Sequence, residues 1–185
     1  AGFLNENPDM TLQTIEGDST FVKELLTDGK CDIAFLRSES SSVKEFNSIP
    51  YMIDYLTAVL PATHPLAKAD NLPFEQLRGE TFLLFPEHSF INDLCIRECR
   101  NAGFEPHIAY TGNRGATLID LVRNGAGITL MMHHSARQEN DSSLAFIPVT
   151  PGIYSYISLN YAKEKPLSPQ AESFVRYVKA HKRNF

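Results

Sequence analysis

The chain alternates between segments whose apolar residues recur at helical spacing and short runs of consecutive apolar residues. In the first helical segment the apolar residues fall on one face: Phe21, Val22, Leu25 and Leu26. Asp18 or Ser19 can cap its start, and Gly29 ends it. Residues 31–36 follow as a short buried strand. Because strands that alternate with helices form sheets covered by those helices, the pattern predicts an α/β fold with parallel strands.

The same pattern continues to the end of the chain in two blocks. We expect strands at residues 11–16, 31–36, 46–53, 55–60, 81–85, 107–111, 128–132, 144–149 and 154–162. We expect further helices at residues 90–102, 117–124 and 169–182, and one amphipathic turn at 74–77. Two blocks joined by long strands indicate two Rossmann-like α/β lobes with two crossover strands. Lobe I is expected at residues 1–58 and 152–185, and lobe II at residues 59–151.

The segment Asn124-Gly125-Ala126-Gly127 lies between a helical pattern and the apolar run at 128–132. A dinucleotide-binding glycine motif needs the opposite order, in which a strand leads into the glycines and a helix follows with its free N–H groups facing the phosphates. Asn124 or Gly125 can instead take the left-handed conformation that ends a helix. We therefore interpret these glycines as a chain reversal.

Charge and composition narrow the function classes. The formal net charge of -5 argues against nucleic-acid binding by this segment alone, because that affinity rests on Lys and Arg. The one basic cluster, Lys179, His181, Lys182 and Arg183, fits the solvated end of a helix. No apolar run approaches the roughly 20 residues that span a membrane, and no signal peptide is evident. Three cysteines, an odd number, favour reduced thiols. We expect a soluble cytoplasmic protein without membrane contact.

Metal, cofactor and catalytic sites find little support. His133 and His134 are adjacent, so they point to opposite faces at a strand end, and no acidic or thiol partner is near them in sequence. Cys95 and Cys99 lie four residues apart on one face of an expected helix, where packing is the simpler role. The sequence contains no G-x-S-x-G, H-E-x-x-H or P-loop motif. We expect no metal, no cofactor and no enzymatic activity.

Four motifs occur in the order and spacing of a known family. FLNENPDMTLQTIEGDSTFVKELLTDGKCDIAF, at the start of the chain, resembles the start of the effector-binding domain of LysR-type transcriptional regulators; the matching residues are Phe3, Pro8, Leu12, Glu16, Leu25, Leu26, Gly29, Asp32 and Ile33. LTAVLPATHPLA resembles the family's crossover segment, LIDLVRNGAGITLM its V-x-x-G-x-G-I motif, and KPLSPQAESFVRYV its terminal helix. The resemblance covers essentially the whole chain.

The resemblance implies a fold similar to type 2 periplasmic binding proteins, with a small-molecule effector between the lobes. In that family a winged helix-turn-helix and a linker helix precede this domain, which implies that DNA is bound only through that preceding part. Family members also begin the effector domain with a strand and the start of a helix before the position of Phe3, so lobe I is expected without them. The rival class is a transport-type solute-binding protein of the same fold, and a weaker third class is an enzyme on this scaffold.

The resemblance also implies an oligomer. Relatives pair these domains side by side and antiparallel, which implies a homodimer or tetramer. The helix at 90–102 is a candidate interface because its apolar face is wide, with Ile91, Leu94, Cys95 and Ile96. Packing of that face against its own sheet is the alternative. Peroxide-sensing relatives carry a reactive thiol in the first turn of this helix and a second near its end. Cys99 matches the second position, but Phe90 occupies the first, which argues against that mechanism.

Four segments are implied to face the effector, each at the end of a strand. They are Ser19-Thr20, following Asp18; His88-Ser89-Phe90; Asn113-Arg114; and Met132-His133. Thr20 and Ser89 can donate hydroxyl hydrogen bonds, and Phe90 can pack on an apolar part of the ligand. Arg114 can pair with a carboxylate, and helix N-termini suit small anions. The alternatives stay open that Ser19 and Ser89 are simple N-caps and that Arg114 is a solvated loop residue.

Overall fold

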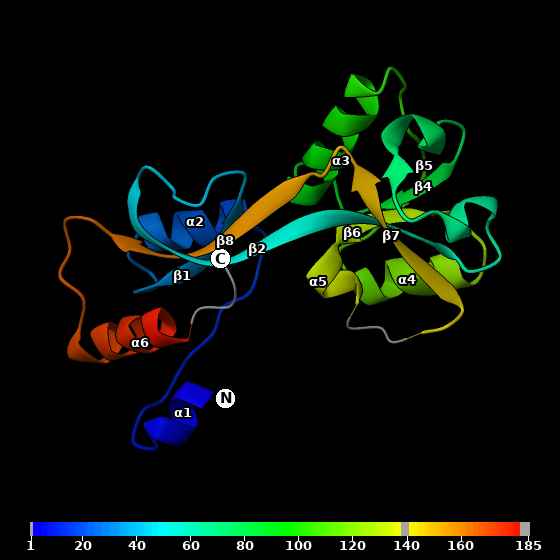
Figure 1. Cartoon of the computed structure of the whole chain (residues 1–185). Helices are drawn as coiled ribbons and strands as arrows, with labels where there is room; N and C mark the ends of the chain where they lie inside the picture. The colour runs from blue at the N-terminus through cyan, green and yellow to red at the C-terminus, as the bar shows by residue number, and fades with distance from the viewer. Residues whose placement is uncertain (1, 138–140, 182–185) are drawn as a thin grey trace. The chain divides into compact units, whose positions relative to one another are not determined.

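A computed structural model describes residues 2–137 and 141–181. The chain forms two compact units. Unit 1 combines Ala1–Ile53 with Ser155–Phe185, and unit 2 is Asp54–Tyr154. The chain passes between them within the 16-residue strand β2 (Phe46–Pro61) and at the first residue of β8 (Tyr154–Ala162), as two crossover strands (Figure 1). The expected lobe limits, between residues 58 and 59 and between residues 151 and 152, stay a prediction. Strand β2 spans residues 58 and 59 without a break.

Unit 1 is a three-stranded sheet with a helix on each face. Its strand order is β1 (Ala34–Ser38), β8 and β2, and β1 runs antiparallel to β8. α2 (Ser19–Thr27) packs on one face, over a core of Leu26, Ala34, Leu36 and Phe46. α6 (Pro169–Ala180) packs on the other, over Ile49, Leu159, Val175 and Val178. The short helix α1 (Gly2–Glu6) packs on α6 through Phe3, whose ring centroid lies 4.9 Å from that of Phe174.

Unit 2 is built on a mixed sheet. β2 pairs antiparallel with β6 (Thr129–Met132) and with β7 (Leu144–Thr150), and β7 pairs parallel with β3 (Leu72–Pro73). β4 (Thr81–Leu84) pairs parallel with β5 (His107–Thr111). A parallel bridge between Phe82 and Ile128 links β4 to the segment that leads into β6.

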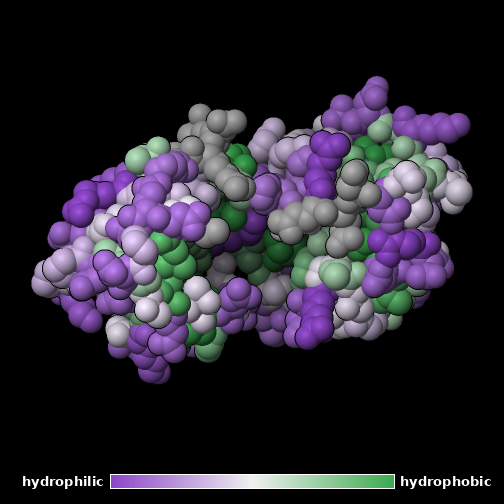
Figure 2. Space-filling model, turned by 90° about the horizontal axis from the view of Figure 1, so that it is seen from below, coloured by the Kyte–Doolittle hydropathy of each residue, from purple (hydrophilic) through white to green (hydrophobic). Residues whose placement is uncertain are grey.

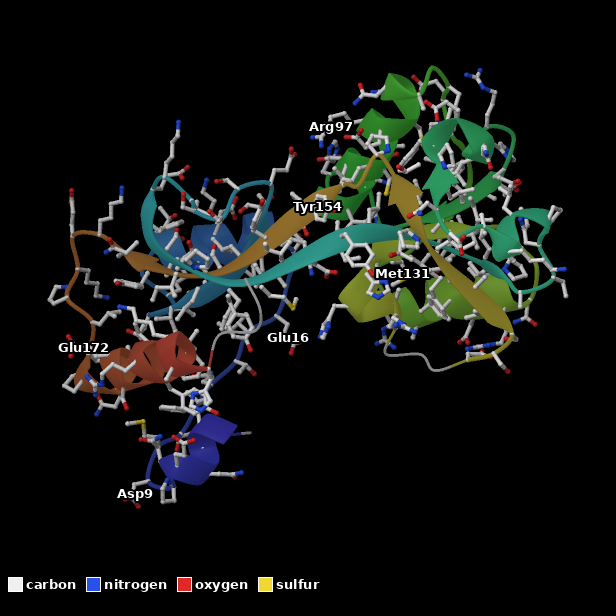
Figure 3. The ribbon with its side chains drawn as sticks, in the orientation of Figure 1. Asp9, Glu16, Arg97, Met131, Tyr154 and Glu172 are labelled. Atoms are coloured by element: carbon white, nitrogen blue, oxygen red, sulfur yellow. The ribbon has the colours of Figure 1, made fainter. Side chains whose placement is uncertain are left out.

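Helices cover both faces of this sheet. α3 (Phe90–Asn101) lies on one side with the 3₁₀ helix η2 (Phe74–Leu77), while α4 (Gly115–Arg123) and α5 (His133–Ala136) lie on the other (Figure 1). Neighbouring residues of one strand supply both cores because successive side chains point to opposite faces. Leu130 and Met132 enter the core under α3, and Met131, labelled in Figure 3, enters the core under α4.

The glycine segment is a chain reversal between α4 and β6, as predicted. Gly125, at φ +75°, donates to the carbonyl of Val122, and the N–H of Ala126 donates to Leu121, which together end the helix in a Schellman motif. At Gly127 a Cβ atom would lie only 2.4 Å from the carbonyl oxygen of Thr81. This close approach lets the next residue, Ile128, donate its N–H to the same oxygen at 2.8 Å.

Residues 11–16 do not form the expected strand. They are exposed, and within the described residues no strand pairs with them. Leu12 and Ile15, which carry the alternating pattern, are 42% and 49% exposed. Alternating apolar residues specify a strand only where a neighbouring strand supplies backbone partners and a core buries one face.

The expectation of parallel sheets was correct only for part of the fold. Strands joined through one helix run parallel, as β4 and β5 do around α3. β1, β2, β6, β7 and β8 also form antiparallel pairs, because their connections are long enough to return the chain in either direction.

The remaining differences concern short or terminal segments. Residues 46–53 and 55–60 form the single strand β2, and α1, α5, β3 and the 3₁₀ helix η1 (Pro65–Lys68) were not expected. Lys182, the expected last residue of the terminal helix, and Arg183 lie outside the described residues. Hydrophilic residues cover most of the surface shown in Figure 2. Among the described helices, none is both long and apolar enough to cross a membrane.

Candidate functional site

Three of the four predicted segments meet at one edge of the sheet in unit 2. β4 and β5 are parallel, and the bridge from Phe82 to Ile128 gives the strand leading into β6 the same direction, so the carboxyl ends of all three lie together. Residues 88–90 follow β4, residues 113–114 follow β5, and Met132 ends β6 with His133 directly after it. Gly115, at the start of α4, contacts this edge directly, since a Cβ there would lie 2.8 Å from Met131 Cε.

The loop after β4 is held by its own hydrogen bonds. Ser89 caps α3: its hydroxyl accepts the N–H of Asn92 at 3.3 Å and donates to the carbonyl of Pro86 at 2.7 Å. Asn92, 4% exposed, donates its side-chain N–H to the carbonyl of Phe85 at 2.8 Å. His88 is exposed and has φ 64°, a left-handed conformation uncommon for residues other than glycine. Phe90 is partly buried against the core under α3. The Ser89 hydroxyl therefore already has one donor and one acceptor partner.

The N-terminus of α4 differs from those of the other long helices. In α2, α3 and α6 the N-cap side chain accepts a backbone N–H of the first turn, the acceptors being Asp18, Ser89 and Ser168. The N-cap of α4 is Arg114, which makes no such bond. Arg114 and Asn113 are exposed, and among the described residues no carboxylate pairs with Arg114. The first turn of α4 thus combines uncapped N–H groups with a guanidinium group.

His133 is held by two side chains of β2 that share one face of the strand. Its ring stacks on Tyr55, with centroids 4.3 Å apart and planes 21° apart. Its Nδ1 lies 3.2 Å from the hydroxyl oxygen of Thr57, which is fully buried. Partial burial is the first cause that lowers the pKa of His133, and the positive charge of Arg137 is the second. The lowered pKa favours the neutral imidazole at pH 7.

The N-terminus of α5 is capped from β2. The side chain of Asp54, a residue that is 3% exposed, accepts the backbone N–H of His134 at 3.0 Å. It also accepts the backbone N–H of Tyr55, the next residue of β2, at 3.0 Å. The two histidines begin this short helix rather than end a strand, with His133 partly buried and His134 exposed. In the described part of the chain no group of three or more His, Cys, Asp or Glu side chains is arranged to hold a metal ion.

Ser19 and Thr20 lie in unit 1, at the start of α2. The carboxylate of Asp18 accepts the N–H of Thr20 at 2.9 Å and of Phe21 at 3.0 Å, so Asp18 and not Ser19 is the cap. The hydroxyl of Ser19 instead accepts the N–H of Arg37 at 3.3 Å, while Thr20 is exposed. Because the Asp18 carboxylate already occupies this helix N-terminus, α2 offers less to an anionic ligand than α4 does.

Sequence reasoning missed Asp54, Tyr55 and Thr57. All three belong to β2, far in sequence from His133 and His134. The available signal was weak: polar residues interrupt an otherwise apolar strand at Asp54 and Thr57, and polar groups in a buried strand need partners.

The cysteines of α3 are core residues. Cys95 and Cys99 are 0% exposed and belong to the core under that helix. Burial raises the pKa of Cys99 to about 12 and that of Cys95 well above its usual value. Thiols in this setting stay protonated, which disfavours the nucleophilic thiolate that redox sensing needs.

Known proteins resemble the chain over nearly its whole length. The profile described as the LysR substrate binding domain matches residues 1–183. The transcriptional dual regulator GltC of Bacillus subtilis (strain 168) is 25% identical over 179 residues, which cover 96% of this chain and 60% of GltC. The chain thus spans about three fifths of the length of that relative.

Two solved structures show the shared fold. The regulatory domain of CcmR from Synechocystis PCC6803, in complex with 2-PG, superposes with a TM-score of 0.89 at 16% identity, covering 100% of this chain and 89% of that chain. The BenM effector binding domain with its effector benzoate superposes with a TM-score of 0.77 at 19% identity, covering 96% and 81%. The expected α/β fold with two crossover strands is confirmed, and the chain belongs to the LysR substrate binding domain family.

Proposed function

We propose that this domain senses a small anionic metabolite for a LysR-type transcriptional regulator, and that the anion binds at the carboxyl edge of β4, β5 and β6. The observation that carries the proposal is the N-terminus of α4, where Arg114 is exposed without a carboxylate partner in the described chain and no side chain caps the helix. A carboxylate placed there gains the first-turn N–H groups and a guanidinium that can bind it through two hydrogen bonds.

The surrounding groups support this position. The N-termini of α3 and α5 are occupied by Ser89 and Asp54, so in unit 2 α4 has the unoccupied donors. Phe90 and His133, both partly buried, lie beside this edge as the first residues of α3 and α5. BenM, which shares the fold, has benzoate as its effector, and benzoate is a carboxylate. A ligand of this kind regulates only through its different affinities for two arrangements of the protein.

The test is a thermal-shift screen of the domain against small carboxylates, benzoate included, followed by calorimetry on any that raise the melting temperature. A ligand at 100 times its dissociation constant stabilises the folded state by about 2.7 kcal/mol. Arg114→Ala should weaken binding by about tenfold or more, because a charged hydrogen bond contributes about 1.5–3 kcal/mol. Arg176→Ala, which removes an exposed arginine of α6 in unit 1, is the matched control. Unchanged affinity in Arg114→Ala would refute the assigned position.

The proposed sensor domain does not itself bind DNA and does not catalyse a reaction. DNA binding belongs to a part of the protein other than this segment, whose net charge is -5. The domain acts without catalysis, in the cytoplasm, as part of a regulator; GltC, a transcriptional regulator, supports this class over a transport-type solute receptor. An assay that detects turnover of a bound carboxylate would contradict the non-catalytic role.

A homodimer or tetramer is also part of the proposal. The apolar face of α3 gives it limited support, because Leu94 and Cys95 are buried in the helix's own unit and Ile91 and Ile96 are partly buried there. The neighbouring strand β5 is more accessible, with Ile108 38% and Tyr110 39% exposed. Sedimentation velocity at micromolar concentration tests the association. Ile108→Lys should shift the domain toward monomer if β5 lies in the interface.

A further inference from the structure

We propose that Thr57 is a positioning residue that holds His133 in the neutral tautomer protonated at Nε2, so that the ring presents a hydrogen-bond donor to an acceptor group of the ligand. The inference rests on the proposed function for its ligand, but the state of the ring follows from contacts inside unit 2. Nothing in the sequence motifs points to Thr57, which lies 76 residues from His133 along the chain.

The hydroxyl group of Thr57 determines which nitrogen of His133 carries the proton. Thr57 is 0% exposed, and a buried hydroxyl group requires a hydrogen-bond partner. In the described structure its hydroxyl has one partner, Nδ1 of His133 at 3.2 Å. The hydroxyl proton therefore has an acceptor only if Nδ1 is unprotonated. A proton on Nδ1 would point at the hydroxyl oxygen and leave the hydroxyl proton without an acceptor among the described residues.

Two contacts fix the orientation of the His133 ring. Stacking on Tyr55, at 4.3 Å between centroids, sets the plane of the imidazole, and the contact with Thr57 sets its rotation within that plane. The neutral ring carries its single proton on Nε2, across the ring from Thr57. In the described part of the chain no group hydrogen-bonds to Nε2, and His133 keeps part of its surface exposed at the carboxyl end of β6. This atom is therefore available to a ligand.

The charged groups around the ring agree with a neutral state. Burial and the positive charge of Arg137 lower the pKa of His133, His134 acts in the same direction, and Asp54 acts in the opposite one. The Asp54 carboxylate is itself engaged by the backbone N–H groups of Tyr55 and His134. The ligand atom at Nε2 is consequently an acceptor, such as a carboxylate or carbonyl oxygen, and a donor such as an ammonium group is excluded from this point.

The test is ¹⁵N NMR of the histidine rings in the free domain at neutral pH, with His133→Gln used to assign the signals. We expect an unprotonated Nδ1 and a protonated Nε2 in the wild type and in Thr57→Ser, which keeps the hydroxyl. In Thr57→Val, which removes the hydroxyl at nearly equal volume, we expect the two tautomers to mix. A proton on Nδ1 in the wild type, or a Thr57→Val spectrum identical to the wild type, would overturn the assignment. Circular dichroism of both variants verifies the fold.

A separate titration tests the contact between the ligand and Nε2 of His133. The carboxylate with the largest shift in the thermal screen is titrated into the wild type, Thr57→Ser and Thr57→Val. We expect binding to weaken in Thr57→Val only, by the inverse of the fraction of rings that keep the proton on Nε2, which is about twofold for an equal mixture of tautomers. Equal affinity for all three would show that Nε2 does not contact the ligand. A screen without any shift would refute the proposed function, while the NMR result would stand on its own.

Discussion

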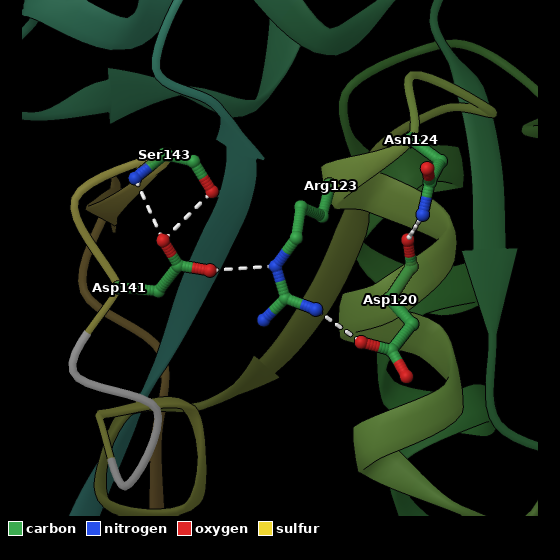
Figure 4. A network of polar contacts seen from close by, with 5 residues as sticks. All are labelled: Asp120, Arg123, Asn124, Asp141 and Ser143. Carbon is green, nitrogen blue, oxygen red and sulfur yellow. Dashed lines mark hydrogen bonds and ion pairs between the residues drawn. The ribbon is translucent and has the colours of Figure 1, made fainter.

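Arg123 Nε donates to Asp141 Oδ2 at 2.6 Å and thereby ties the last turn of α4 to the segment that leads into β7 (Figure 4). The same carboxylate accepts the backbone N–H of Ser143 at 2.8 Å and its hydroxyl at 2.7 Å. Arg123 also pairs with Asp120, one turn earlier on α4. Because α4 presents Arg114 at its other end, this network helps to fix the element that carries the candidate anion site.

This network predicts a stability loss at low pH. The hydrogen bonds from Ser143 and then Arg123 lower the pKa of Asp141 from 3.8 to about 2. A carboxyl group whose pKa is depressed on folding contributes stability above its unfolded pKa and loses it as the pH falls through the folded value. Asp141→Asn should therefore lower the urea midpoint at pH 7, with a difference from the wild type that disappears near pH 2. Asp120→Asn, at a more exposed position, is the control and should have a smaller effect. A pH-independent difference for Asp141→Asn would contradict the electrostatic cause.

The glycine segment predicts two different costs for the same change. Gly125→Ala should cost about 1 kcal/mol, because φ is +75° but nothing lies within 4 Å of the added Cβ. Gly127→Ala should lower the free energy of unfolding by about 3 kcal/mol. The added Cβ would lie 2.4 Å from the Thr81 carbonyl oxygen and would push β4 away from the start of β6. Equilibrium denaturation in urea measures both free energies of unfolding, and equal costs would exclude the close approach as the reason.

The three thiols should react at different rates. Burial raises the pKa values of all three thiols, but Cys31 is partly exposed whereas Cys95 and Cys99 are buried. In the native domain we expect a chromogenic disulfide reagent to modify Cys31 alone, and all three cysteines after unfolding in guanidinium. Cys31→Ser should then leave almost no native reactivity. Rapid native labelling of Cys95 or Cys99 would reopen a redox role for α3.

The helix caps separate stability from the proposed binding role. Ser89→Ala removes the acceptor for the Asn92 N–H and should lower the free energy of unfolding by about 1 kcal/mol, or the melting temperature by roughly 2–4 °C. Arg114→Ala removes no capping bond and should change stability by less than about 0.5 kcal/mol. Differential scanning calorimetry without ligand provides both values. A large loss in Arg114→Ala would mean that this side chain has a structural partner.

The sequence by itself determined the local elements. α2 and α3 begin directly after the candidate caps Asp18 and Ser89, and α6 begins at residue 169 as expected, because a capping side chain and the apolar residues that follow it lie within one or two turns of each other. The reversal at Gly125 was equally predictable, since the left-handed conformation it needs is a property of the residue itself.

The tertiary structure alone decided what depends on contacts between distant segments. Residues 11–16 have a strand-like pattern but no pairing strand among the described residues, so the pattern alone did not make a strand. Asp18 and Ser19 were equivalent candidates for the N-cap of α2 in the sequence. In the structure Asp18 caps the helix, and the Ser19 hydroxyl accepts the N–H of Arg37. His133 gained its stacking and hydrogen-bond partners from Tyr55 and Thr57 through the antiparallel register of β2 and β6, which no local signal encodes. Capping and helical periodicity act within a few residues, whereas strand register is fixed by cooperative packing across the whole unit.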